Sequence, residues 1–425
     1  MKTVISLLMV TLLLVGVAGC ARTASAGEVK SHKPRITAPP VDKGDLETLA
    51  KGNTSFAFRL YQAAGATEGN LFYSPYSISE ALAMTYAGAR GETEKQMAEA
   101  LSFKMAQERL HPAFNNLDLQ LRERGQGAKG KDGKGFRLNV TNAIWGQRDY
   151  KFLAPFLDVL AQNYGAGLRV VDFAGATEPS RITINDWVSD QTEGKVKDLV
   201  PRGAINQLTR LVLTNAIYFN AAWQYPFRKE STSGGPFNLL GGSIVTVPMM
   251  NQTESLGYAE GDGYQAVELP YEGRELSMVI LVPRSGKFQD FQKGLSAEKV
   301  SDIIGKLQTR RVALTFPKFQ FTSSLGLKQS LSALGMGVAF TEQADFSGMN
   351  GKRDLLIQDV LHKAFVSVDE AGTEAAAATA VIVGTTSLPP TPVELKIDRP
   401  FVFLIRDIPT GSTIFVGIVT DPSAK

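Results

Sequence analysis

The early part of the chain alternates apolar and polar positions at helical spacing. Ser74 offers a capping hydroxyl, and Pro75 suits the first position of a helix. Apolar or small residues then recur every three to four positions, at Ile78, Ala81, Leu82 and Thr85. The pattern predicts a helix that begins at residue 75, and two further helices are expected over residues 92–101 and 112–122.

Strand-like runs dominate the later part of the chain. They cover residues 211–219, 276–282, 401–405 and 413–419, and Val312, Leu314 and Phe316 alternate with other residues. Helices come early and long strands without regular intervening helices come late, an order that predicts an α+β fold rather than a doubly wound α/β fold. No linker after residue 53 is long enough to separate two domains, so we expect one large domain over residues 53–422.

The first twenty residues have the pattern of an export signal. Lys2 is followed by an apolar run over residues 4–17, and the small residues 18 and 19 then precede Cys20. The run is too short to span a bilayer comfortably. The pattern resembles the bacterial lipobox, which implies acylation of Cys20, and a plain signal peptide with an incidental cysteine is the alternative. Residues 21–52 are predicted to be a flexible tether.

Export places the mature protein outside the cytoplasm. Ala21 rather than Asp follows Cys20, which favours outer-membrane sorting in a cell that has an outer membrane. We therefore expect a lipid anchor in the outer membrane or at the cell surface, or secretion if the lipobox is not used.

Composition narrows the classes of function. Of 425 residues, 44% are apolar and 20% are charged, enough for a large core, and the net charge is only +3. This balance gives no reason to expect specific nucleic-acid binding. Cys20 is the only cysteine, which excludes an intramolecular disulfide framework, a cysteine-based zinc site and an iron–sulfur cluster. No cofactor and no metal site are predicted.

An enzyme is the least favoured class. A hydrolase needs a nucleophile, a base and an orienting group within reach of one another. The chain has three histidines, and His32 lies in the predicted tether, which leaves His111 and His362 as candidate bases. The G-x-S-x-G and H-E-x-x-H motifs are absent from the sequence.

Residues 122–137 form a basic segment with two interpretations. Residues 125–130 match G-x-G-x-x-G, but the strand before it and the helix after it that a phosphate loop requires are not predicted. The basic residues are Arg122, Arg124, Lys129, Lys131, Lys134 and Arg137. A solvated loop is favoured, and a polyanion site is the alternative.

Residues 370–392 do not fit their surroundings. Four alanines at 375–378 favour a helix, whereas Gly372 and the β-branched residues that follow do not. A connection this long in a compact domain is usually functional or disordered. Counted by two, one face of an extended segment would be small or β-branched and uncharged: Thr373, Ala375, Ala377, Thr379, Val381 and Val383. The segment could therefore enter a buried sheet with that face inward.

These residues point to a family. The run from Val366 to Ala380 closely resembles the hinge of the reactive-centre loop in serpins, the serine-protease inhibitor superfamily. Further matches follow in the family's order, in residues 70–79, 185–195, 213–219, 247–250, 269–271, 345–347, 362–364, 399–401 and 415–417. The resemblance covers about residues 53–422. It implies the serpin fold: helices around a large central mixed sheet, smaller sheets and an exposed loop, in a monomer.

The resemblance also implies a mechanism. In an inhibitory serpin the serine of the target protease attacks a loop carbonyl and forms an acyl-enzyme, and the loop then inserts into the main sheet with the protease still attached. We therefore expect a suicide-substrate inhibitor of serine endopeptidases, with cysteine endopeptidases as a second class. The alternatives are a non-inhibitory serpin and an envelope lipoprotein that binds polyanions. The small residues of the hinge favour inhibition, because bulky or charged ones would resist burial.

Family spacing assigns the site residues. The attacked bond falls between Thr386 and Ser387, and a slip by one residue would select Thr385. The implied hinge comprises Glu370, Gly372, Thr373, Glu374, Ala375, Ala376, Ala377, Ala378 and Thr379. The implied shutter, a hydrogen-bonded cluster beneath the opening of the sheet, comprises Ser74, Ser77, Asn215 and His362, and Trp223 marks the implied breach. Thr386 is neither basic nor aromatic, which favours an elastase-like or subtilisin-like target.

Overall fold

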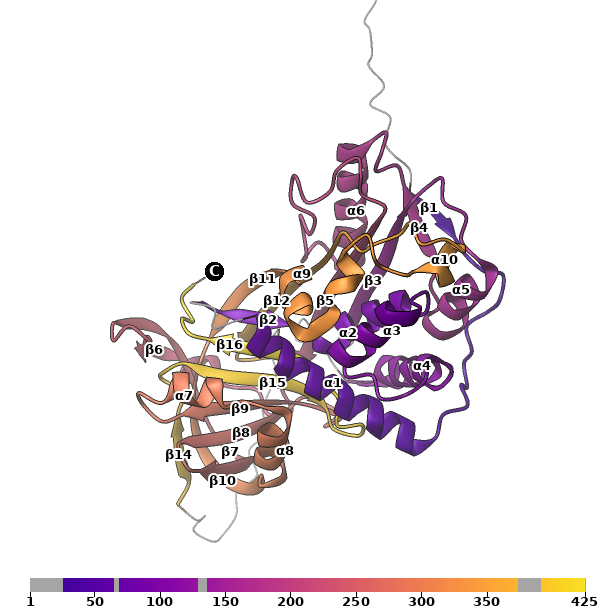
Figure 1. Ribbon diagram of the computed structural model, residues 1–425. Coiled ribbons are helices and arrows are strands. Elements are labelled where there is room, and N and C mark those ends of the chain that lie inside the picture. Colours follow the sequence, from indigo (N-terminus) through magenta and orange to yellow (C-terminus); the bar gives the residue numbers. More distant parts are fainter. Residues whose placement is uncertain (1–25, 65–68, 129–135, 374–390, 425) are drawn as a thin grey trace, which may run out of the picture.

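The computed structural model describes residues 26–64, 69–128, 136–373 and 391–424. Its helices lie largely in the first half of the chain and its strands in the second (Figure 1). The fold class is therefore α+β, as the order of patterns along the sequence predicts.

The helices begin and end close to the predicted positions. They are α1 Lys43–Ala63, α2 Pro75–Tyr86, α3 Gly91–Ala100, α4 Gln107–Glu123, α5 Ala154–Val159, η1 Leu160–Tyr164, α6 Thr177–Gln191, α7 Phe288–Lys293, α8 Ala297–Gly305, α9 Lys328–Leu331, η3 Ser332–Met336, η4 Gly337–Phe340 and α10 Ser347–Asn350, with a short η2 Lys229–Ser231. Ser74 caps α2 as expected, since its Oγ accepts a hydrogen bond from the Ser77 amide at 3.1 Å. Helix α4 begins five residues before the predicted start, and Pro112 lies inside it.

The strands form two sheets. They are β1 Gly27–Val29, β2 Leu71–Tyr73, β3 Arg137–Gln147, β4 Leu168–Val171, β5 Leu211–Ala222, β6 Ser233–Asn238, β7 Ile244–Gly261, β8 Tyr264–Pro270, β9 Leu276–Pro283, β10 Gln308–Pro317, β11 Phe319–Gly326, β12 Asp359–Asp369, β13 Gly372–Thr373, β14 Val393–Lys396, β15 Phe401–Asp407 and β16 Thr413–Val419. One sheet has the order β1-β4-β3-β5-β13-β12-β11. The other has the order β14-β10-β7-β8-β9-β15-β16-β2, with β6 paired to β7.

Both faces of the first sheet are covered. On β5, Leu213 and Ile217 point into the large core that contains α2, whose residues are all buried. Their neighbours Val212 and Ala216 point into a smaller core with Ile184 and Val188 of α6 and with Trp145. This alternation is the period-two pattern of a strand buried on both sides. Trp145 is fully buried against Trp187, so core packing explains both.

The structure differs from the predicted flexible tether over residues 26–52. Strand β1 pairs with β4, and α1 begins at Lys43 and buries Leu49. The partners of both elements lie far away in the sequence, so local composition gave no signal for them. Residues 21–25 of the predicted tether lie outside the described residues.

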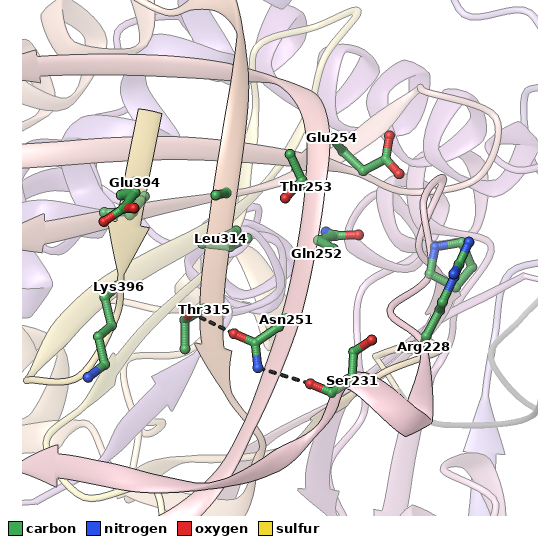
Figure 2. A pocket seen from close by; sticks show the side chains of 13 residues that line it. Arg228, Ser231, Asn251, Gln252, Thr253, Glu254, Leu314, Thr315, Glu394 and Lys396 are labelled. Atoms are coloured by element: carbon green, nitrogen blue, oxygen red, sulfur yellow. Dashed lines mark hydrogen bonds between the residues drawn. The ribbon is translucent and has the colours of Figure 1, made fainter. Parts of the chain in front are cut away.

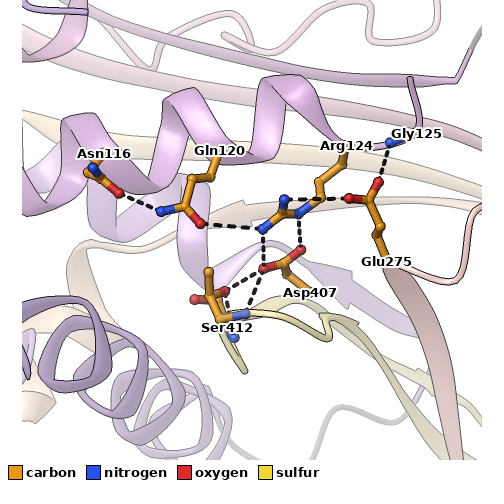
Figure 3. Close-up of polar contacts among 8 residues, drawn as sticks. Asn116, Gln120, Arg124, Gly125, Glu275, Asp407 and Ser412 are labelled. Atoms are coloured by element: carbon orange, nitrogen blue, oxygen red, sulfur yellow. Dashed lines mark hydrogen bonds and ion pairs between the residues drawn. The ribbon is translucent and has the colours of Figure 1, made fainter. Parts of the chain in front are cut away.

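Arg124 follows the last residue of α4 and ties that helix to two turns (Figure 3). Its Nε donates to Asp407 Oδ1 at 2.7 Å, and its guanidinium lies 3.6 Å from Glu275 Oε1. The Asp407 side chain is fully buried, and its Oδ2 also accepts from the Thr410 hydroxyl at 2.6 Å. Arg124 is therefore the cation that makes a buried carboxylate tolerable.

We expect Arg124→Met to lower the free energy of unfolding by about 3 kcal/mol, because Asp407 would stay buried without its cation. Urea denaturation of the variant and the parent chain measures this difference. The control is Lys306→Met, which removes an ion pair to Asp302 with both side chains more than half exposed and should leave the stability close to that of the parent chain. Equal losses of unfolding free energy in the two variants would contradict a stabilising role for the buried Arg124–Asp407 ion pair.

Candidate functional site

The seven-stranded sheet is paired differently at its two ends. Strands β5 and β12 pair directly and in parallel, with residues 212–217 opposite residues 359–364. Toward their other ends they are separated by β13, which is antiparallel to both. There Gly372 lies between Ala222 and Asp369, and Thr373 lies between Ala221 and Val368. The chain that follows, residues 374–390, lies outside the described residues and includes the rest of the predicted hinge and the bond between Thr386 and Ser387.

Gly372 allows the chain to enter between the two strands. Its φ is +151°, and a Cβ at this position would lie 2.2 Å from the carbonyl oxygen of Ala221. Any side chain would therefore collide with the backbone of β5, and glycine is required by contact as well as by conformation. The structure thus places this predicted hinge residue where a turn into the sheet begins.

Two stacked rings lie at the same point. Trp223 donates from its amide to the Ala371 carbonyl at 2.9 Å and from its ring Nε1 to the Asp369 carbonyl at 3.0 Å. Its ring stacks on Tyr271 with the centroids 4.7 Å apart. The Tyr271 hydroxyl lies 2.9 Å from Thr373 Oγ1, and burial raises the pKa of that hydroxyl. Trp223, which the resemblance assigns to the breach, thus contacts the chain at Asp369 and Ala371, just before β13, and Tyr271 is a partner that sequence reasoning missed.

Glu370 fastens the base of the loop. Its Oε2 lies 2.7 Å from Lys318 Nζ, its Oε1 accepts from the Thr232 hydroxyl at 2.8 Å, and its carbonyl accepts from the Phe227 amide. Burial acts to raise the pKa of this carboxyl, but the hydrogen bonds from Lys318 and Thr232 outweigh it and hold the pKa below its usual value. No spacing in the sequence links Glu370 to Lys318 or Thr232, so these partners were not found.

The four predicted shutter residues meet in one buried cluster. His362 Nε2 accepts from the Ser74 amide at 3.2 Å, and its Nδ1 is hydrogen-bonded to Asn215 Oδ1. The Asn215 amide is in turn bonded to Ser77 Oγ. Asn215 and His362 are also register partners across β5 and β12. The cluster therefore lies under the stretch where these strands still pair directly.

The cluster continues to two residues that the sequence did not indicate. Asn142, opposite Asn215 in the pairing of β3 with β5, accepts from Ser77 Oγ at 3.0 Å. Its Nδ2 donates to Glu80 Oε2 at 2.7 Å, and Glu80 is itself buried. A polar residue inside each of two buried strands is the signal that could have suggested this extension.

A polar trough of about 840 Å³ borders the other end of the loop. Strands β7, β10 and β14 form its floor, and residues 226–231 form a wall (Figure 2). Within it, Asn251 accepts from the Thr315 hydroxyl at 2.7 Å and donates to the Ser231 carbonyl. Strand β14 begins at Val393, so this trough adjoins the C-terminal side of residues 374–390.

The described part of the basic segment is largely neutralised. Arg122 pairs with Asp118, Arg124 pairs with Asp407, and the Arg137 guanidinium lies 3.1 Å from Glu193. Lys129, Lys131 and Lys134 lie outside the described residues. Among the residues that the structure describes, no three or more His, Cys, Asp or Glu gather as a metal site, and no helix is long and apolar enough to cross a membrane.

The cluster should make stability depend on pH. Burial lowers the pKa of His362 to about 3, against about 6.5 in an unfolded chain. Between these values the unfolded chain binds the proton and the folded chain does not, so this site's contribution to stability is present above pH 6.5 and falls as the pH is lowered. At pH 5 the loss is about 2 kcal/mol.

We therefore expect His362→Gln to become more stable relative to the parent chain by about 2 kcal/mol between pH 7.5 and pH 5, whatever its offset at pH 7.5. Urea unfolding at both pH values measures the difference, and groups common to both chains cancel. His111→Gln should behave alike, since burial also lowers the pKa of His111 to about 3. If the difference in unfolding free energy between variant and parent did not change with pH, the imidazole of the replaced histidine would not be buried in its neutral form.

Comparisons with known proteins agree with the geometry. The family model "Serpin (serine protease inhibitor)" matches residues 51–422. The chain is 38% identical to an uncharacterised serpin-like protein of Thermococcus kodakarensis, over 98% of this chain and 99% of that protein. It is 39% identical to the leukocyte elastase inhibitor of Homo sapiens, over 89% of this chain and all of the relative.

Solved structures share the fold that the resemblance implies. Human glycosylated kallistatin matches with a TM-score of 0.78 at 30% identity, over 90% of this chain and 100% of that chain. Uncleaved ovalbumin matches with a TM-score of 0.78 at 23% identity, over 88% of this chain and 100% of that chain, and shows likeness of fold. With the family match covering most of its length, the chain belongs to the serpin family.

Proposed function

We propose that this chain inhibits a serine endopeptidase by presenting residues 374–390 as bait and then inserting the cleaved segment between β5 and β12. The observation that carries the proposal is the position of β13, whose two residues already lie between these strands and pair with both. The relatives named leukocyte elastase inhibitor support protease inhibition in general.

The register shows what insertion must displace. If β13 continues in its present register, residue 377 comes opposite Ile217 and Ala364, and Thr379 comes opposite Asn215 and His362. Insertion beyond residue 376 therefore has to break the direct pairing of β5 with β12 and part the Asn215–His362 hydrogen bond. This cluster is the natural barrier to insertion in the uncleaved chain.

Insertion has a favourable free energy to release. Each inserted residue adds ladder hydrogen bonds worth about 1 kcal/mol net, and its inward side chain leaves water. At about 3.3 Å per residue, residues 373–386 would span roughly 45 Å as a strand. This reaches across the sheet and would carry a protease bound at Thr386 to its far end.

Two alternatives to this function remain. The first is a serpin that does not inhibit a protease, and the second is a lipoprotein that binds polyanions. The paired states of Arg122, Arg124 and Arg137 weaken the second, which then depends on Lys129, Lys131 and Lys134. Salt-dependent retention on heparin that is lost on neutralising these three lysines would support it.

We expect an SDS-stable complex with an elastase-like or subtilisin-like protease, and mass spectrometry of the released fragment should place the cut after Thr386. Trypsin should give no complex, because the proposed cut site has no basic residue. Complete cleavage by the elastase-like and subtilisin-like enzymes without any complex would mean a non-inhibitory serpin. A trypsin complex cut after a basic residue would overturn the assigned bond.

A matched pair of loop variants tests insertion itself. Thr373 points to Tyr271, so residue 377 should share its inward face, opposite the buried Ile217 and Ala364. Ala377→Glu should be cleaved at the parent rate but form at least about tenfold less complex, since a carboxylate would have to be buried. Ala376→Glu should keep the complex, because its register places it beside Tyr218 and Phe365, near the Lys195 ammonium. Equal loss in both variants would contradict insertion in this register.

We also propose export and lipid attachment at Cys20, on the pattern of residues 2–20. Cells fed labelled palmitate should incorporate label into the parent chain and not into Cys20→Ser, which should be recovered in a soluble extracellular or periplasmic fraction. Label retained in Cys20→Ser, or absent from both chains, would contradict the anchor.

A further inference from the structure

Residues 27–36, here called the N-terminal strap, lie across the edge of the seven-stranded sheet. Strand β1 forms the edge of the sheet and pairs with β4, with Gly27 opposite Val170 and Val29 opposite Leu168. The strap also contacts elements outside the sheet. The Ile36 amide donates to the Gln162 carbonyl at 2.9 Å, and Lys33 Nζ lies 2.8 Å from Asp158 Oδ2. It thus ties the sheet edge to α5 and η1.

Arg35 is the buried contact of the strap. Its Nε donates to Asn115 Oδ1 at 2.8 Å, and its guanidinium lies 2.6 Å from Asp118 Oδ2. The Asp118 side chain is 6% exposed and that of Arg35 is 17% exposed, so this ion pair is largely shielded from water. The Asn115 amide donates back to the Ile36 carbonyl at 2.7 Å. The strap is therefore locked onto α4 as well.

Asp118 belongs to a buried acidic pair that reaches the shutter cluster. Burial and then the charge of Asp118 raise the pKa of Glu80 to about 8, and Arg122 and Arg35 act against this rise. Glu80 holds the Asn142 amide, and Asn142 is bonded to both Ser77 and Asn215. Arg35 is thus one of two cations that pair with Asp118 beneath the cluster, the other being Arg122.

We propose that the N-terminal strap is a lock that holds the sheet against loop insertion, and that Arg35 is its principal contact. This proposal rests on the loop insertion proposed above. Arg35 acts as a positioning residue, since it touches neither β13 nor the described ends of the loop.

The pairing order explains how a strap at the edge can act at the centre. Insertion requires β5 to move away from β12, and β5 is paired to β3, which is paired to β4. These strands must therefore shift as a block relative to the helices beneath them. The strap holds the outer strand of that block to α4, α5 and η1. Its release removes these ties and leaves Asp118 without one of its two cations.

The test measures spontaneous conversion of the uncleaved chain, without any protease. Parent and variant chains are incubated below their melting temperature, and circular dichroism melting then gives the fraction converted to a form of higher melting temperature. We expect Arg35→Met to convert about tenfold faster, which corresponds to a barrier lower by about 1.4 kcal/mol. The control Lys33→Met, whose side chain is 55% exposed, should stay within about twofold of the parent.

Two further variants separate the lock from general damage. A chain that begins at residue 38 should convert at least as fast as Arg35→Met, and a synthetic peptide of residues 26–37 should slow it. The double variant Arg35→Met with Glu80→Gln should convert at the Arg35→Met rate at pH 7, because Glu80, with a pKa of about 8, is already largely uncharged there. Parent-like rates in the truncated chain and in Arg35→Met would overturn the lock.

A cleaved parent chain distinguishes failure of the lock from failure of the proposed function. Cutting within residues 374–390 should raise the melting temperature if the segment inserts. If cleavage raises it while the strap variants convert at the parent rate, the lock alone is wrong. If cleavage leaves the melting temperature unchanged, insertion and the lock are both wrong.

Discussion

The direct pairing of β5 with β12 is the constraint on which the rest of the structure depends. Both strands lie inside the sheet, and their pairing over residues 212–217 and 359–364 keeps the sheet closed at one end. At the other end Gly372 and Thr373 hold them apart. The boundary between β5 and β12 is thus closed at one end of the sheet and open at the other. Further residues after Thr373 could continue β13 along this boundary without any change in strand order.

The polar cluster beneath this boundary sets how firmly it stays closed. Polar side chains in a core are tolerated when their donors and acceptors are paired, and here Ser74, Asn215 and His362 satisfy one another. The same bonds cross from α2 to β5 and β12, so the strands cannot part without breaking them. A cluster of apolar residues would resist separation less specifically, because its contacts could slide. The polar cluster therefore keeps β5 and β12 paired until its hydrogen bonds break together.

Sequence patterns predicted the elements whose signals are local. Ser74 and Pro75 marked the start of α2, and apolar runs located β5, β9, β15 and β16. Resemblance to the family named Gly372 and Trp223, which the structure places where the strands part, and the four shutter residues, which it places beneath the stretch that stays paired. Partners that meet only in the fold were missed: Lys318 and Thr232 on Glu370, Tyr271 on Trp223, and Glu80 behind Asn142. Strand β1 was missed for the same reason, since its partner β4 lies far along the chain.

The register also relates the two ends of the sheet to the ends of the chain. Gly27, Val170, Gly146 and Leu211 lie in one row across four strands, at the end where an inserted segment would finish. Figure 1 shows β14, which follows the loop, at the opposite end of the molecule from β1.

Cys20 precedes Gly27 by seven positions, which reach only about 25 Å when fully extended. A chain anchored at Cys20 would hold its loop away from the membrane, but a trapped protease would arrive on the membrane side. Release of the whole N-terminal strap would free the chain as far as Lys43 and lengthen this reach to about 80 Å. For an anchored inhibitor, the strap that holds the sheet closed is thus also the segment whose release makes room for the trapped protease.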